Sequence, residues 1–158
     1  MPSNRTCAII TIVFVWFGSM AQANEADPLS LYLKIINISD ENKTVFCAKV
    51  RAKAYFVYKY THSLQKLPIE EKFRVRSDRT FELVDSKVLS LAAAGLFPSP
   101  HETLCNEKKY THIRTSRVFK FVQIRATYYY NQYLILDNDI FNISEKVTPG
   151  DLLEMTID

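Results

Sequence analysis

Glycine is scarce in this chain, and its scarcity argues against two classes of active site. Gly18, Gly95 and Gly150 are the three glycines among 158 residues. Phosphate-binding loops need several glycines, because their backbone N–H groups must approach the phosphate without a Cβ in the way. The turn that presents the serine of a G-x-S-x-G hydrolase needs a glycine on each side of it. We therefore expect neither type of site.

Long hydrophobic runs are also lacking, and the one apolar stretch near the N-terminus is short. The uncharged segment Cys7–Phe17 follows Arg5 and precedes the small-residue pattern Ala21-Gln-Ala23. A membrane anchor is the alternative reading, but the segment is too short to cross a hydrocarbon layer of about 30 Å. The order of charge, apolar stretch and A-x-A site predicts a secretory signal peptide over residues 1–23.

The rest of the chain, residues 24–158, has the length of one ordinary domain. No later stretch approaches the roughly 18 apolar residues of a membrane-spanning helix, so no transmembrane anchor is predicted in the mature chain. We expect a secreted, extracellular or periplasmic protein.

Cysteine is rare, and the few cysteines fit an exported protein. Cys7 lies in the predicted signal peptide, which leaves Cys47 and Cys105. In an oxidising compartment we predict a disulfide between them, which would close a loop of nearly sixty residues and add about 4 kcal/mol of stability. The alternative is a metal site made of Cys105 with His101 and His112. That spacing matches no common zinc pattern, so no metal is predicted.

Charge of one sign is not in large excess. The net charge is +3, and it falls to +2 once Arg5 is removed with the signal peptide. This small excess and the absence of a nucleic-acid-binding motif indicate that nucleic acid is not the partner.

What the sequence does contain is alternation. From Thr44 to Tyr60, apolar residues recur at every second position, which predicts one long strand or two strands joined by a bulge. Its apolar face should point to the core and comprises Phe46, Ala48, Val50, Ala52, Ala54, Phe56, Tyr58 and Tyr60. A second long β segment is predicted over Arg117–Tyr130.

Counting the shorter β-rich segments gives about eight strands. One short helix is predicted over Lys87–Ala94, with Gly95 ending it. The predicted fold is therefore mainly β, an antiparallel β-sandwich with one short helix. A partly open β-barrel is the second choice.

The opposite face of the first long segment carries a row of basic side chains. Lys49, Arg51, Lys53 and Lys59 alternate along it, with Tyr55 among them. Such a row predicts a binding site for an anionic lipid head group, an acidic glycan or an acidic protein surface. The alternative is an ordinary solvated sheet face whose counter-charges lie on the next strand.

Catalytic signals are sparse. His62, His101 and His112 fall in predicted connections, and no H-x-H or H-E-x-x-H spacing occurs. Candidate carboxylates are Glu70, Glu71, Asp137, Asp139 and Glu145, and the run from Asp137 departs from a calcium loop after three residues. We assign no catalytic residue and expect no cofactor.

The function these features favour is a non-enzymatic binding protein of the cell envelope or of a host surface. Two alternatives remain open. One is a small secreted hydrolase with carboxylates and histidines assembled from loops. The other is a structural subunit of an envelope assembly.

Three asparagines, Asn37, Asn42 and Asn142, head N-x-S/T sequons. In a eukaryotic secretory pathway such sequons accept glycans at surface positions. In a bacterium they carry no such meaning.

The predicted signal peptide gives a direct test. Cleavage after Ala23 leaves Asn24 as the mature N-terminus, because a signal peptidase cuts after the second small residue of an A-x-A site. Intact-mass measurement of the exported protein should show this. A mass that retains Trp16 and Phe17 would refute the signal peptide.

Overall fold

The computed structural model describes residues 30–63, 66–89, 91, 102–107 and 109–158. The predicted signal peptide, His101 and most of the predicted helix lie outside these residues. Within them, no helix has the length and apolar character needed to cross a membrane.

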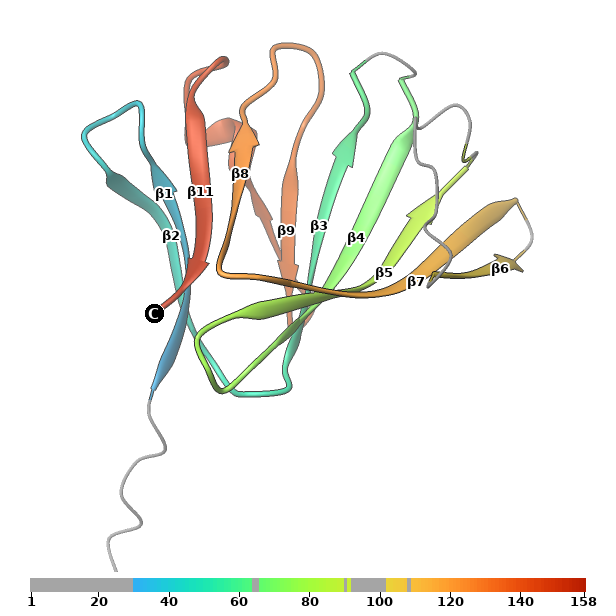
Figure 1. Cartoon of the computed structure of the whole chain (residues 1–158). Coiled ribbons are helices and arrows are strands. Elements are labelled where there is room, and N and C mark those ends of the chain that lie inside the picture. Colours follow the sequence, from blue (N-terminus) through green and yellow to red (C-terminus); the bar gives the residue numbers. More distant parts are fainter. Residues whose placement is uncertain (1–29, 64–65, 90, 92–101, 108) are drawn as a thin grey trace, which may run out of the picture.

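The described chain forms two antiparallel sheets (Figure 1). The eleven strands are β1 (Leu31–Asn37), β2 (Lys43–Val50), β3 (Tyr55–Thr61), β4 (Pro68–Val75), β5 (Phe81–Val88), β6 (Thr103–Glu107), β7 (Tyr110–Phe119), β8 (Phe121–Arg125), β9 (Tyr133–Leu136), β10 (Asp139–Asn142) and β11 (Leu152–Ile157). A single 3-10 turn, η1 (Ile143–Glu145), is the one helical element of the described residues. The small sheet has the order β2-β1-β11-β8, and the large sheet β10-β9-β3-β4-β5-β7-β6. The predicted mainly-β sandwich is confirmed.

The two long β segments each divide between the sheets. β2 belongs to the small sheet and β3 to the large one, and a turn at Arg51–Ala54 joins them. Lys53 makes this turn with a positive φ of 70°. Likewise β7 lies in the large sheet and β8 in the small one, with Lys120 alone between them. The segment expected to run on to Tyr130 ends as a strand at Arg125.

The helix predicted from Lys87 does not begin there. Lys87 and Val88 are the last residues of β5, where Val88 pairs with Ile69 of β4. Val88 is fully buried and packs with Ile69 and Ile113 in a small cluster of its own. Burial of Val88 on a strand face therefore decides the structure at the predicted start of the helix.

Alternation correctly identified the core-facing residues of β2 and β3, whereas Ala52, in the turn between them, is exposed. Phe56 and Tyr58 are buried, and Phe46 and Ala48 pack against the same cluster. At its centre Phe56 stacks on Phe73 with ring centroids 5.1 Å apart, and meets Phe81 at 5.6 Å. These rings join the large sheet to buried Leu and Ile side chains of β1 and β11.

The predicted disulfide is wrong, because the fold separates the two cysteines. Cys47 is an exposed free thiol on β2, and Cys105 is a free thiol on β6. β2 packs near β10, where Phe46 meets Phe141 at 4.8 Å, whereas β6 is the other edge of the large sheet. The two edges lie at opposite sides of the molecule (Figure 1).

The aromatic core gives a stability prediction. Phe56→Ala should lower the free energy of unfolding by about 3–5 kcal/mol, because it leaves a cavity between Phe73 and Phe81. Ile140→Ala, at a side chain that is 68% exposed, should change it by less than about 0.5 kcal/mol. Urea unfolding followed by circular dichroism measures both. Equal effects of the two substitutions would contradict this description of the core.

Candidate functional site

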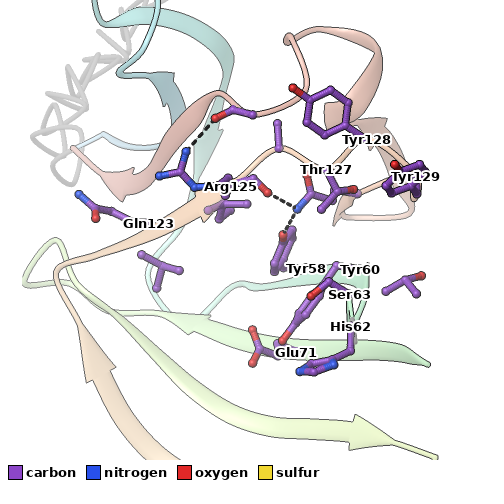
Figure 2. A pocket seen from close by; sticks show the side chains of 16 residues that line it. Tyr58, Tyr60, His62, Ser63, Glu71, Gln123, Arg125, Thr127, Tyr128 and Tyr129 are labelled. Atoms are coloured by element: carbon purple, nitrogen blue, oxygen red, sulfur yellow. Dashed lines mark hydrogen bonds between the residues drawn. The ribbon is translucent and has the colours of Figure 1, made fainter. Parts of the chain in front are cut away.

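A cleft of about 590 Å³ opens between the two sheets (Figure 2). One wall comes from β3 and β4 with the turn that follows β3, and the other from β8 with the loop that follows it. The lining residues are Tyr58, Tyr60, Thr61, His62, Ser63, Glu71, Val122, Gln123, Ile124, Arg125, Ala126, Thr127, Tyr128, Tyr129, Gln132 and Gly150.

The position of the cleft follows from the alternation along β4. Val75 and Phe73 point into the main core, and Ile69 points into the small cluster with Val88 and Ile113. Glu71 occupies the same face between these two apolar regions. In Figure 1 the side of the large sheet formed by β5, β7 and β6 extends beyond the small sheet. Glu71 thus lies on the inner face, in the cleft between the main core and the small cluster.

Gln132 ties the two walls together at the back of the cleft. Its side-chain Nε2 donates to the Tyr58 hydroxyl oxygen at 2.8 Å and to the backbone carbonyl of Arg125 at 3.0 Å. Gln132 is 3% exposed, and its Oε1 has no hydrogen-bond partner among the described residues. Since the Tyr58 oxygen accepts from Gln132, the Tyr58 hydroxyl proton remains to be donated elsewhere.

Glu71 is the carboxylate of the cleft, and its environment favours the protonated form. Burial raises the pKa of Glu71 to about 7, although a hydrogen bond from the Tyr60 hydroxyl and the charge of Arg117 act to lower it. Burial also raises the pKa values of Tyr58 and Tyr60, so both remain neutral phenols. Their rings stack with centroids 4.8 Å apart.

The rim of the cleft is more polar and more exposed. Arg125 donates to the backbone carbonyl of Gly150 at 2.9 Å. Tyr128 and Tyr129 are 73% and 87% exposed. Figure 2 shows these residues along one wall, with His62, Ser63 and Glu71 along the other.

The structure does not gather the predicted basic row on one face. Lys49 lies on β2, Arg51 and Lys53 lie in the turn between the sheets, and Tyr55 and Lys59 lie on the outer face of β3. The row therefore runs from one sheet to the other, and its binding role stays a prediction.

Two members of that row have partners on the neighbouring strand β4. The Lys59 ammonium is 3.0 Å from the Glu70 carboxylate. The Tyr55 ring has the ammonium of Lys72 4.6 Å from its centroid. For these two residues the arrangement matches a sheet face with cross-strand partners.

The other sequence candidates have local structural roles. His112 Nδ1 contacts Asp85 at 2.8 Å, and Cys105 is opposite His112 in the β6–β7 pair.

The carboxylate candidates near the end of the chain lie in turns. Asp137 and the following Asn138 have positive φ values of 49° and 76°, as a two-residue hairpin turn requires. Glu145 accepts a hydrogen bond from Asn142 at 2.8 Å. Among the described residues, no three His, Cys, Asp or Glu side chains are grouped to hold a metal ion.

One sequon is buried by the fold. Asn37 is 2% exposed, and its amide donates to Asp151 at 2.6 Å. A glycan cannot be attached there in the folded protein. Asn42 lies exposed in the β1–β2 turn.

Sequence reasoning named Glu71 as one of several carboxylates and placed Tyr58 and Tyr60 on the core-facing side. It missed Gln132 and Arg125. The available signal for Gln132 was a polar residue between two apolar β segments, and this pattern does not distinguish a solvated turn from a buried amide.

A family model described as a domain of unknown function (DUF1850) matches residues 56–143. The matched segment contains every lining residue of the cleft except Gly150, and it excludes β1, β2 and β11. No curated protein and no solved structure shows significant similarity to the chain.

The raised pKa of Glu71 predicts a pH-dependent stability. The ordinary glutamate pKa is 4.5, whereas Glu71 in the fold keeps its proton until about pH 7. Between these values the folded chain binds more protons than the unfolded chain, so this group makes the protein less stable as pH rises. Glu71→Gln should therefore stabilise the protein at pH 8 by roughly 1–2 kcal/mol and change little near pH 4.

The matched control is Glu70→Gln, on the adjacent residue. Burial acts to raise the pKa of Glu70, but hydrogen bonds from Lys59 and Lys87 outweigh it and hold the pKa below the ordinary value. This carboxylate stabilises the fold above its ordinary pKa, so its removal should not stabilise the protein at pH 8. Urea unfolding at several pH values compares the variants. A Glu71→Gln protein that is less stable than wild type at pH 8 would contradict the assignment.

Proposed function

The chain belongs to the DUF1850 family, and we propose that it is an exported, non-enzymatic binding protein that holds a small organic ligand in the cleft between its sheets. The observation that carries this proposal is the set of groups that converge there. Tyr58, Tyr60, Glu71 and Gln132 come from separate strands and loops and meet in one concave site.

The composition of the cleft supports ligand binding. Small-molecule sites are concave, have largely apolar and aromatic walls, and contain a few placed polar groups that orient the ligand. Here Val122, Ile124 and Ala126 provide apolar surface opposite the tyrosines. Gln132 and Glu71 provide polar groups, and the Gln132 amide is held by two hydrogen bonds.

The alternative of a small hydrolase has less support. Glycoside hydrolysis by the common mechanisms needs two carboxyl groups across the scissile bond. Among the described residues that line the cleft, Glu71 is the single carboxylate. Its raised pKa suits a general acid, but the second group of such a pair is not in the described lining.

An anionic partner bound by the basic row is the other version of a binding function. Its support is reduced because Lys59 already faces Glu70. Arg51 and Lys53 stay exposed in the turn between the sheets. This version therefore places the contact at one turn rather than along a strand.

The test is binding of a mixed set of small amines, alcohols, carboxylates and phenols, followed by NMR on isotope-labelled protein. Compounds that bind should shift the resonances of Tyr58, Tyr60 and Gln132. Tyr60→Ala should weaken such binding about tenfold or more, because it removes one aromatic wall. Tyr55→Ala, on the outer face of the same strand, is the matched control and should have no effect.

A further variant separates the two binding sites. Reversal of Lys49, Arg51 and Lys53 to Glu should leave binding in the cleft unchanged. If only acidic lipids or glycans bind, and this triple reversal abolishes their binding while Tyr60→Ala does not, the cleft is not the functional site.

A further inference from the structure

Resting on the proposed function, we propose that the ligand of the cleft carries an organic cation, an ammonium group that binds against Glu71 beside the stacked rings of Tyr58 and Tyr60. The argument compares two consecutive carboxylates on one strand. Glu70 and Glu71 point to opposite faces of β4 and differ in their partners.

On the outer face, the protein itself neutralises Glu70. The ammonium groups of Lys59 and Lys87 lie 3.0 and 3.2 Å from its two carboxylate oxygens. On the inner face, Glu71 receives a hydrogen bond from the Tyr60 hydroxyl, but no Lys or Arg of the described residues forms an ion pair with it. Among the described residues, the ionised form of Glu71 therefore has no ion-pair partner, and a cationic ligand in the cleft would supply one.

The other charged groups around the cleft leave this position to a ligand. Arg117 acts on Glu71 from a distance and forms its own ion pair with Glu102 at 2.5 Å. Arg125 lies on the opposite wall and donates to the Gly150 carbonyl. His62 lies on the same side of the cleft as Glu71, so the experiment must separate the two residues.

The remaining groups at the Glu71 wall also favour a cation. The ring faces of tyrosines attract cations, because the π electrons make these faces negative. Tyr58 and Tyr60 stand next to Glu71 on the neighbouring strand.

The direction of the pH dependence follows from Glu71. A cation binds the ionised carboxylate, which is formed as pH rises through about 7. Affinity for a permanently charged cation should therefore increase from acid to neutral pH and level off above it. A neutral ligand of the same shape should not show this increase.

Choline and 3,3-dimethyl-1-butanol provide that comparison, because they have the same shape and differ in charge. Binding of each is measured by NMR titration of the purified protein at pH values of roughly 5.5 and 8.5, on either side of the Glu71 transition. We expect choline to bind at least about tenfold more tightly than the alcohol at the higher pH, and to lose this advantage at the lower pH.

Three variants assign the effect to its residue. Glu71→Gln should bring choline down to the affinity of the alcohol, whereas Glu70→Gln should bind choline as wild type does. His62→Asn should keep the pH dependence, since the titrating group is the carboxylate. Thermal melts of each variant confirm that it is folded.

Several results would overturn the proposal. They are equal binding of choline and the alcohol, choline binding that Glu71→Gln leaves unchanged, and a pH dependence that vanishes in His62→Asn. Binding of neutral or anionic compounds in the cleft, with no binding of choline, tetramethylammonium or putrescine, refutes the cation but leaves the proposed function standing. If no compound of any charge shifts the cleft resonances, both proposals fail.

Discussion

The four strands of the small sheet cannot cover the whole inner face of the seven-stranded sheet. The side chains on that inner face change from apolar to polar where the small sheet ends. Phe56, Phe73 and Phe81 lie under the small sheet and form the core. Beyond β8 the same faces carry Tyr60 and Glu71. A polar group on an inner sheet face is costly unless water or a partner can reach it. The unequal width of the sheets therefore determines both where the cleft opens and which residues line it.

Sequence alternation predicted the faces of β2 and β3 but not the sheets to which they belong. The period of two continues from β2 through the turn at Arg51–Ala54 into β3, because both strands direct the same parity of side chains towards one shared interior. Across Lys120 the parity changes instead, because Phe119 of β7 packs against the core and so do Val122 and Ile124 of β8. The alternation shows which side chains face the interior, but it does not show where the chain passes from one sheet to the other. The disulfide prediction failed for a similar reason. It was based on an even number of cysteines, and that number says nothing about the distance between Cys47 and Cys105 in the fold.

For the candidate site too, the sequence showed some residues but not their roles. The Glu70-Glu71 pair was visible as two carboxylates, but their roles depend on strand register. Register places Lys59 and Lys87 beside Glu70, and it places Tyr58 and Ser86 beside Glu71. Gln132 acquires its role from a contact with Tyr58, 74 positions earlier in the chain. Long-range pairing of this kind is set by tertiary packing, and local residue patterns do not encode it.

The strand order of the small sheet also has a consequence for synthesis. β11 lies between β1 and β8, so the first and the eighth strands have no common partner until residues 152–157 have been made. β8 forms one wall of the cleft, and among the described strands β11 is its single neighbour in the sheet. In a growing chain, β1 can pair with β2, but β8 cannot join the small sheet, and this wall of the cleft cannot be completed, before the last strand is made.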